Sequence, residues 1–365
     1  MSRAAKGAVT ILIAAGGTGG HVYPALEVAK RLRARGINVE WLGTRKGLEA
    51  KLVPGEGFRL HALSVGGLRG KGLMRWLLAP FVLIAALGRS LKVLKSVRAR
   101  LVLGMGGYAA GPGGVAAWLL RIPLFIHEQN AVPGLTNRIL SRIASKVMEA
   151  FPGSFDPRVG AVHAGNPVRA EIGALPGPKT RLAERSGPLR VLVLGGSQGA
   201  RAINQVLPDA LVALPSGEMV EVRHQAGPLH LEGTRRRYTK AGIHIEPVAF
   251  IDDMAAAYAW ADLVICRAGA MTVCEVAAAG VAAVFVPFPY AVDDHQTRNA
   301  KYLSDAGAAV LVREADLTPA LLRDLLCEFA SARQRLVTMA TAARGLAVPD
   351  AAERVTTWCM EAAHA

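Results

Sequence analysis

The chain has 365 residues, of which 52% are hydrophobic and only 5% aromatic, and its formal net charge is +15. This length suffices for two ordinary domains with a core in each, and the composition excludes a disordered or disulfide-stapled chain. The four cysteines form no C-x-x-C pair and lie at no metal-ligand spacing from a histidine. We therefore expect buried thiols in a reducing compartment and no metal site.

The basic charge is concentrated in the first half of the chain. Residues 1–167 contain 23 Lys and Arg against seven Asp and Glu, whereas residues 168–365 contain 20 against 21. No acidic residue lies between Glu56 and Glu128, a stretch that holds ten basic residues. Such a one-sided field predicts an anionic partner, and nucleic acid, phosphate compounds and a membrane surface all remain open at this point.

Residues 8–32 begin with an apolar run, pass through a glycine-rich turn and continue as an amphipathic helix. The basic start of the chain and this apolar run suit a first β-strand better than a signal peptide, because a glycine turn and a helix pattern follow. This order of elements opens a doubly wound α/β domain. Further strands are predicted at 38–44, 101–107 and 123–130.

Residues 189–214 repeat the same plan half a chain later. Strands are predicted to follow at 219–227, 244–251, 261–269 and 282–289, with helical stretches between them. Strands separated by helices indicate parallel sheets. The chain is therefore predicted to be an α/β protein with two tandem Rossmann-like, doubly wound domains.

Glycine and proline cluster at 165–180, which places the domain boundary there. We expect a first domain over 1–167 and a second over 168–345. The last helical segment, 346–365, can pack on either domain. The arrangement we consider is that it packs back on the first domain.

The two glycine loops are not dinucleotide fingerprints. In the first loop Val22 stands where G-x-G-x-x-G needs its third glycine, and in the second loop Ser197 replaces the second one. A nicotinamide cofactor is therefore disfavoured. Glycines before a helix still predict a backbone that a ligand can approach closely, and free N–H groups at a helix N-terminus attract an anion.

Eight blocks of the sequence, taken together and in order, resemble the MurG family of peripheral membrane glycosyltransferases. The resemblance runs from about residue 8 to about residue 305 and rests on the blocks GGTGGHVYPALEVA (16–29), GMGGYAAGPGGVAA (104–117), HEQNAVPGLTNRIL (127–140), GNPVR (165–169), GGSQGARAIN (195–204), FIDDM (250–254), CRAGAMTVCE (266–275) and DDHQTRNA (293–300).

The resemblance implies a GT-B fold, with two domains facing each other across a cleft, and a specific reaction. The family moves N-acetylglucosamine from UDP-N-acetylglucosamine to the 4-hydroxyl of undecaprenyl-pyrophosphoryl-N-acetylmuramoyl-pentapeptide (lipid I), with inversion at the anomeric carbon, giving lipid II. It needs no cofactor. The reaction belongs to peptidoglycan synthesis, and hence to cell shape and division, at the cytoplasmic face of the bacterial plasma membrane. Other cell-wall synthesis proteins are a further expected class of partner.

By the same resemblance the second domain binds the donor. Glu275, one turn inside the helix after a glycine turn, is expected to hold the ribose hydroxyls, and the helix N-terminus is expected to face the diphosphate. The family has serines at Cys266 and Cys274 and often leucine at Met271, so no role is assigned to those side chains. The alternative is that Glu275 lies on a solvent-exposed face of its helix and has no role in binding. The full expected donor set is Thr18, Gly19, Gly20, Asn130, Arg169, Ser197, Ile251, Ala270, Met271, Thr272, Val273, Cys274, Glu275 and Gln296.

His21 is the candidate catalytic base, since a neutral imidazole is suited to accepting a hydroxyl proton near pH 7. The alternatives are a purely structural histidine at the helix start and Glu128 as a rival base. The acidic pairs at 252–253 and 293–294 have the composition of metal ligands. Helix dipoles usually replace the metal in the fold implied here, so none is assigned.

Residues 65–100 combine an apolar run with basic flanks. The run from Trp76 to Gly88 contains Pro80 and is shorter than the roughly 20 residues that a membrane span needs. We expect it to lie on an anionic membrane surface, and the alternative is a buried helix with a solvated basic edge. The residues expected to contact the acceptor or the membrane are Arg69, Lys71, Arg75, Trp76, Leu77, Phe81 and Tyr108.

Rival functions remain open on the sequence alone. A UDP-N-acetylglucosamine 2-epimerase, or another glycosyltransferase that uses a UDP-sugar, would share the donor half without needing the apolar and basic stretch. A nucleic-acid binder is disfavoured because aromatic residues are sparse and no recognition motif occurs. A non-catalytic UDP-sugar sensor would have little use for a histidine at the acceptor loop.

Overall fold

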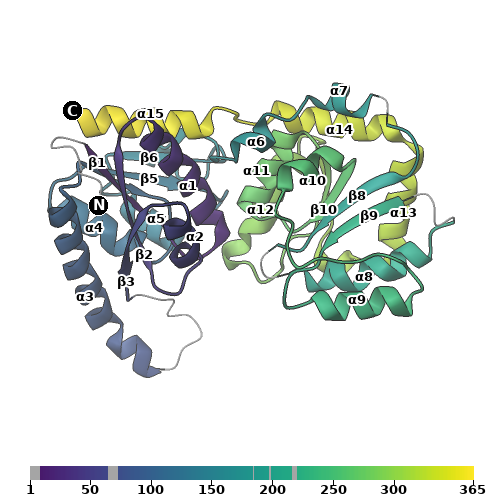
Figure 1. Ribbon diagram of the computed structural model, residues 1–365, viewed down its shortest axis with the longest axis horizontal. Helices are drawn as coiled ribbons and strands as arrows, with labels where there is room; N and C mark the ends of the chain where they lie inside the picture. Colours follow the sequence, from purple (N-terminus) through teal and green to yellow (C-terminus); the bar gives the residue numbers. More distant parts are fainter. Residues whose placement is uncertain (1–8, 65–72, 184, 197–198, 216–219) are drawn as a thin grey trace. The chain divides into compact units, whose positions relative to one another are not determined.

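The computed structural model describes the chain except residues 1–8, 65–72, 184, 197–198 and 216–219, and it describes no side chains at 73–79 or 292. The chain divides into two compact units (Figure 1). The N-terminal unit comprises Met1–Val168 together with Asp350–Ala365, and the C-terminal unit comprises Arg169–Pro349. The last helix therefore belongs to the first unit.

The N-terminal unit alternates strands and helices along its sequence. Its strands are β1 (Thr10–Ala14), β2 (Asn38–Thr44), β3 (Arg59–Leu63), β4 (Leu101–Gly104), β5 (Leu124–Glu128), β6 (Lys146–Glu149) and β7 (Val162–His163). Its helices are α1 (Gly19–Ala34), α2 (Glu49–Gly55), α3 (Leu73–Val97), α4 (Ala110–Leu119), α5 (Leu135–Leu140) and α15 (Ala351–His364).

These strands form one parallel sheet in the order β3-β2-β1-β4-β5-β6-β7. Successive strand side chains point to opposite faces of a sheet. Ile11 and Ile13 of β1 accordingly join a core with α1 and α15, while Leu12 and Ala14 join a second core with α3 and α4. Both faces of the sheet are covered, as a parallel sheet requires, and the strand ends are left to carry the functional loops.

Helix α15 completes the first of these cores. Val355, Cys359 and Ala363 recur at helical spacing and are buried in the same cluster as Val22 and Leu26 of α1. Figure 1 shows α15, the end of the chain, lying along the N-terminal unit beside α1. The last helix is thus part of that unit's interior.

The C-terminal unit repeats the plan with a smaller sheet. Its strands are β8 (Leu189–Leu194), β9 (Val220–Gln225), β10 (Leu263–Cys266), β11 (Ala282–Phe285) and β12 (Ala309–Leu311). Its helices are α6 (Ala170–Gly173), α7 (Pro178–Leu182), α8 (Arg201–Val212), α9 (Leu231–Lys240), α10 (Met254–Trp260), α11 (Ala270–Ala279), α12 (His295–Ser304), α13 (Pro319–Ser331) and α14 (Arg333–Gly345).

The sheet of this unit is also parallel, in the order β12-β11-β10-β8-β9. Leu189, Val191 and Val193 of β8 form a core with residues of α8 and α13 on one face. Helices α10 and α11 contact each other and α6. The prediction of two doubly wound α/β domains is confirmed.

The strand predictions hold with one exception. The segment 244–251 was predicted as a strand, and this is wrong, because it makes only a single-residue bridge between Val248 and Gln225 of β9. Pro247 has no N–H to donate, which prevents a continuous ladder there. The short strands β3, β6, β7 and β12 were not predicted, because charged or histidine residues interrupt the first three and β12 has only three residues.

Candidate functional site

The glycine loop between β1 and α1 is held by a buried carboxylate. Glu49 Oε2 accepts a hydrogen bond from Gly17 N at 2.9 Å, and Oε1 accepts from Thr44 N at 2.8 Å and from Thr44 Oγ1 at 2.6 Å. Gly17 has φ +98°, a conformation that favours glycine. Glu49 therefore fixes the shape of the loop by joining it to the end of β2.

His21 lies in the first turn of α1, as predicted. Its ring nitrogen Nδ1 is 2.8 Å from Gln129 Oε1. A Cβ at Gly106 would lie 2.7 Å from the same Nδ1, so glycine is needed at position 106 for the backbone after β4 to approach the imidazole. The ring is therefore confined between the loop after β4 and the loop after β5.

Gln129 and His127 extend this contact into the protein interior. Gln129 Nε2 lies 3.1 Å from His127 Nδ1 and 3.2 Å from the His127 carbonyl oxygen, and His127 Nε2 lies 2.8 Å from the Gly165 carbonyl oxygen. Both side chains are buried. Burial lowers the pKa of His127 to about 4, so this imidazole is neutral at physiological pH.

Glu128 is committed to its own loop. Oε1 accepts from the backbone and side-chain nitrogens of Asn130 at 2.9 and 3.2 Å, and Oε2 accepts from Gly134 N at 3.1 Å and Asn137 Nδ2 at 2.8 Å. The carboxylate is buried. With four donors, the buried carboxylate holds the 129–134 loop in place. Because its oxygens are occupied in this way, Glu128 is disfavoured as the rival base.

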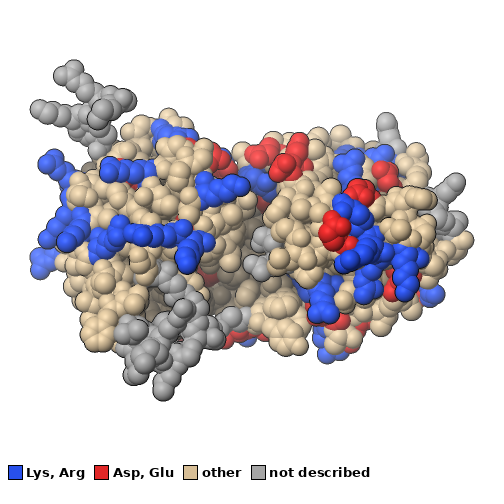
Figure 2. All heavy atoms as spheres, turned by 60° about the horizontal axis from the view of Figure 1, so that its bottom comes forward, with Lys and Arg blue, Asp and Glu red and all other residues tan. Residues whose placement is uncertain are grey.

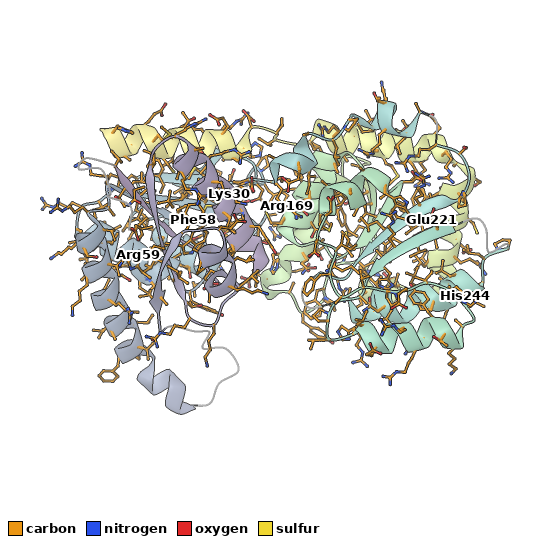
Figure 3. The ribbon with its side chains drawn as sticks, viewed as in Figure 1. Lys30, Phe58, Arg59, Arg169, Glu221 and His244 are labelled. Atoms are coloured by element: carbon orange, nitrogen blue, oxygen red, sulfur yellow. The ribbon has the colours of Figure 1, made fainter. Side chains whose placement is uncertain are left out.

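The C-terminal unit carries the second candidate site, after β10. Glu275 of α11 is 9% exposed, so it is not on the solvated helix face that was the alternative. Arg169 donates to Glu275 Oε1 from its terminal nitrogen at 2.8 Å and from Nε at 3.3 Å, and the Tyr258 hydroxyl donates to Oε2 at 3.2 Å. Arg169, labelled in Figure 3, immediately precedes α6.

Burial dominates the electrostatics of this cluster. It raises the pKa of Glu275, and the charge and hydrogen bonds of Arg169 oppose that shift. Burial alone would lower the pKa of Arg169, but the charge of Glu275 more than offsets it, so the guanidinium keeps its proton. Burial also raises the pKa of Tyr258, which therefore stays a hydroxyl donor. The result is a buried carboxylate whose partners are all donors.

The first turn of α11 offers backbone donors. Gly269 is the N-cap and makes no capping bond with a side chain. Val273 N donates to Gly269 O at 3.0 Å, so the intrahelical bonds begin at Val273 and its own N–H is engaged. The N–H groups with no intrahelical acceptor are therefore those up to Thr272, which include Ala270 and Met271. Cys274 is half-buried one position beyond Val273.

Two other predicted donor residues lie on nearby segments of the same unit. Ile251 is half-buried in the irregular segment before α10. Gln296 stands in the first turn of α12, where its Oε1 accepts from Phe288 N at 3.0 Å. Gln296 therefore ties the loop after β11 to the helix that follows it.

The acidic pairs have local structural roles. Asp253 caps α10 by accepting from Ala256 N at 2.8 Å, and Asp294 accepts from Thr297 Oγ1 at 2.7 Å. Within the residues that the structure describes, no group of three or more His, Cys, Asp or Glu side chains is placed to hold a metal ion.

For six predicted residues the structure describes either nothing or the backbone alone. Ser197, Arg69 and Lys71 lie outside the described residues. Arg75, Trp76 and Leu77 belong to α3, but their side chains are likewise not described. Thr18, Gly19, Gly20 and Asn130 belong to the N-terminal unit, and the other predicted donor residues belong to the C-terminal unit.

Helix α3 exposes an apolar surface. Phe81 is 71% exposed and Ile84 66%, and Val82 and Leu83 between them are also exposed. Residues 81–84 are exposed all round the helix, whereas farther along α3 Ala86, Val93 and Leu94 are buried, the last two in a core shared with α4. The exposed apolar side chains at 81–84 are not those of a buried helix, whereas the part from Ala86 onward has buried apolar residues and exposed basic ones. No helix among the described residues is both long and apolar enough to cross a membrane.

Exposed basic side chains follow this surface along the chain. Arg89, Lys92, Lys95, Arg98 and Arg100 follow the apolar turns along the chain and are all exposed. Figure 2 shows Lys and Arg spread over the visible face of the N-terminal unit with few acidic residues among them, while the C-terminal unit shows both signs. Tyr108, after β4, is also exposed. We call residues 81–84, with these five basic residues, the α3 patch.

The comparisons with known proteins agree over nearly the whole chain. Residues 11–149 match the glycosyltransferase family 28 N-terminal domain, and residues 190–355 match the glycosyltransferase family 28 C-terminal domain.

Two curated relatives carry the name UDP-N-acetylglucosamine–N-acetylmuramyl-(pentapeptide) pyrophosphoryl-undecaprenol N-acetylglucosamine transferase. The one from Alkalilimnicola ehrlichii is 56% identical over 97% of this chain and 99% of its own. The one from Ralstonia nicotianae is 55% identical over 98% of this chain and 97% of its own. The crystal structure of Acinetobacter baumannii MurG superposes with a TM-score of 0.84 at 44% identity, covering 97% of this chain and 99% of that one.

Proposed function

This chain belongs to the MurG family within glycosyltransferase family 28, and we propose how its described residues divide the work of that family's reaction. It transfers N-acetylglucosamine from UDP-N-acetylglucosamine to lipid I, giving lipid II for peptidoglycan synthesis. It has the two-domain GT-B fold of the family. The names of its relatives favour this transfer over the 2-epimerase reaction.

His21 is the proposed general base. The observation that carries this assignment is an imidazole in the first turn of α1, beside a glycine loop, with one ring nitrogen bonded to a buried amide. In the reaction the 4-hydroxyl oxygen of the acceptor bonds to C1 of the sugar, the bond from C1 to the diphosphate oxygen breaks, and UDP leaves with that electron pair. His21 takes the hydroxyl proton and afterwards returns it to solvent.

Glu275 is the proposed ribose ligand. A carboxylate is an acceptor-only group, and two ribose hydroxyls present the donors that such a group binds. Arg169 and the Tyr258 hydroxyl donate hydrogen bonds to this carboxylate in the structure. We propose that the ribose hydroxyls replace some of these hydrogen bonds to the Glu275 carboxylate. Arg169 then binds the diphosphate, whose negative charge needs a positive partner as UDP departs.

The rest of the donor site follows from the first turn of α11. Its N–H groups before Val273 and its dipole are proposed to bind the diphosphate. Ile251 would offer its backbone to the uracil and Gln296 its amide to the sugar hydroxyls. Ser197 is proposed to assist at the phosphate.

In the N-terminal unit Thr18, Gly19 and Gly20 are proposed to approach the substrates through their backbone, with Asn130 at the sugar. The α3 patch is proposed to hold the chain on an anionic membrane surface, because its exposed apolar side chains are next to exposed cations. Arg69, Lys71, Arg75, Trp76, Leu77 and Tyr108 are proposed to extend this contact toward the acceptor.

The membrane proposal sets the cellular role. We place the chain at the cytoplasmic face of the bacterial plasma membrane as a peripheral protein, since its acceptor is anchored in lipid. Its product is then available for wall assembly, which connects it to cell shape and division and to other cell-wall synthesis proteins.

The donor assignment is tested by transfer of labelled N-acetylglucosamine to a short-chain lipid I analogue. Glu275→Gln places an amide donor against Arg169 and the ribose hydroxyls. The KM for UDP-N-acetylglucosamine should therefore rise about tenfold or more, as loss of a charged hydrogen-bond acceptor predicts. Glu221→Gln, an exposed glutamate on β9, is the matched control and should leave KM unchanged. An unchanged KM in Glu275→Gln would move the ribose site elsewhere.

A further inference from the structure

A chain of hydrogen bonds runs from His21 to the backbone of the N-terminal unit. It passes from the His21 ring to the Gln129 side chain, from there to the His127 ring, and ends on the carbonyl oxygen of Gly165. A neutral imidazole has one donor and one acceptor nitrogen. Once a partner fixes which ring nitrogen donates, the other must accept, and this sets the direction of the next hydrogen bond.

The polarity at His127 is set by a carbonyl group. Gly165 O can only accept, so His127 Nε2, 2.8 Å away, carries the proton. His127 is buried and neutral, and its Nδ1 therefore keeps a lone pair. The charge of Glu128 favours protonation of His127, but burial outweighs it, and the Glu128 carboxylate is engaged by its own loop.

The orientation of Gln129 follows from two acceptors. Its amide nitrogen lies 3.2 Å from the His127 carbonyl oxygen and 3.1 Å from the His127 Nδ1 lone pair. Neither atom can donate, so the NH₂ group must face them. The other half of the amide, Oε1, then faces His21 Nδ1 at 2.8 Å and must receive a proton from it.

We infer that Gln129, oriented by His127, is a positioning residue that holds His21 in the Nδ1–H tautomer and leaves Nε2 as the atom that accepts the substrate proton. This inference rests on the proposed role of His21 as the base. Free histidine in water prefers the opposite tautomer, with the proton on Nε2. A base whose reactive nitrogen already carries a proton cannot accept another, so control of the tautomer directly affects the rate.

The surroundings of the ring agree with this assignment. Gly106 and Gln129 both approach Nδ1, which places the confined side of the imidazole at that nitrogen. In the part of the chain that the structure describes, no side chain or backbone group is hydrogen-bonded to His21 Nε2. The nitrogen left for the substrate is therefore the one with the lone pair.

The tautomer can be measured without reference to activity. Nitrogen-15 NMR of histidine-labelled protein distinguishes a protonated ring nitrogen from an unprotonated one, and His21→Ala identifies the His21 signals among the nine histidines. Neutral His21 should show a protonated Nδ1 and an unprotonated Nε2, and His127 the reverse pattern. A protonated Nε2 on His21 in the wild-type chain would overturn the inference.

A matched pair of substitutions isolates the bond to His21. Gln129→Met and Gln129→Glu both lose the two bonds to His127, but only Gln129→Glu keeps an acceptor for His21 Nδ1. The methionine variant should shift His21 toward the Nε2–H tautomer and lower kcat at least about tenfold, with the KM for UDP-N-acetylglucosamine unchanged. The glutamate variant should keep the Nδ1–H tautomer and most of the kcat.

Equal losses of kcat in the two variants, or an unchanged tautomer in Gln129→Met, would reduce Gln129 to a structural residue and overturn the inference. The wild-type spectrum stands as a test even if neither variant folds. Should His21→Ala retain full transfer, the base assignment fails. The spectrum would still decide the tautomer, so the two failures are distinguishable.

Discussion

Glu49 shows how a single buried side chain prepares a ligand loop. Its carboxylate accepts from three donors, one on the glycine loop after β1 and two on Thr44 at the end of β2. Gly16 and Gly47 leave room for it, since a Cβ at either position would overlap the carboxylate. The loop that presents His21 therefore depends on an acid outside the predicted site.

The substitution Glu49→Gln tests this dependence. An amide has only one acceptor oxygen, so its NH₂ group would face at least one of the three donors. We expect a loss of about 1–3 kcal/mol in the free energy of unfolding and a reduced kcat. Urea unfolding measures the first quantity and sugar transfer the second.

The matched control is Glu56→Gln, which changes a half-exposed glutamate paired with Lys30 at 2.9 Å. Such a pair contributes little, and its loss should change stability by less than about 0.5 kcal/mol. Equal effects of the two substitutions would mean that Glu49 has no special role.

The site residues divide into those that a sequence can indicate and those that it cannot. His21 and Glu275 were predicted through the family resemblance, His21 also because an imidazole can accept a hydroxyl proton near neutral pH and Glu275 also because it follows a glycine turn that opens a helix. Glu49, Gln129 and Tyr258 each also bond a partner far along the chain: Gly17 lies 32 residues from Glu49, His21 108 from Gln129, and Glu275 17 from Tyr258. Only the folded sheet brings such partners together. The acid in GTRKGLE, just after β2, is the one local signal that could have indicated Glu49.

At the scale of elements, α3 combines two functions in one helix. Its part from Ala86 onward helps to close the core under the sheet, and residues 81–84 form the apolar part of the α3 patch. The sequence predicted the apolar run and its basic flanks. It placed the run at 76–88, whereas the helix extends over Leu73–Val97 and its buried residues, such as Val93 and Leu94, continue past the apolar run.

We expect the double substitution Phe81→Asp and Ile84→Asp to abolish membrane attachment. It removes two large exposed apolar side chains and adds two charges that anionic headgroups repel. Affinity for vesicles containing phosphatidylglycerol should fall at least about tenfold in a sedimentation assay. Transfer to a short-chain, soluble lipid I analogue should persist.

The control is Val212→Asp, a change at an exposed apolar residue of α8 in the other unit. It should bind the vesicles as the wild type does. If the double variant binds as well as this control, the α3 patch is not the membrane contact.

The pattern of strands was predictable where burial is complete. Strands β4, β10 and β11 are wholly apolar, β1 and β8 are apolar except for Thr10 and Arg190, and all five were anticipated. The edge strands β3, β7 and β12 are short and only partly buried, and their formation depends on a neighbouring strand that no local pattern reveals.

At the scale of the whole molecule, the chain returns to its first unit at the end. Helix α15 buries Val355, Cys359 and Ala363 against α1, and Arg35, the residue just after α1, pairs with Glu353. The stability of the N-terminal unit should therefore depend on residues that follow the C-terminal unit in sequence.

Val355→Asp tests this dependence by placing a charge in the core under α15. We expect a loss of at least about 3 kcal/mol in the N-terminal unit. Hydrogen exchange followed by mass spectrometry should show faster exchange in β1 and β4 and unchanged exchange in β8 and β10. Glu361→Gln, on the exposed side of the same helix, should leave both units unchanged. Faster exchange in the C-terminal unit alone would contradict the packing.

The most direct test of the account compares sugar transfer and donor binding in His21→Ala. The proposal assigns proton removal to the N-terminal unit and UDP-N-acetylglucosamine binding mainly to the C-terminal unit. At saturating donor, His21→Ala should lose at least about a hundredfold in kcat, while calorimetry should show nearly unchanged UDP affinity. His244→Ala, at an exposed histidine labelled in Figure 3, should match the wild type in both. Transfer that survives in His21→Ala would contradict the assignment of the base.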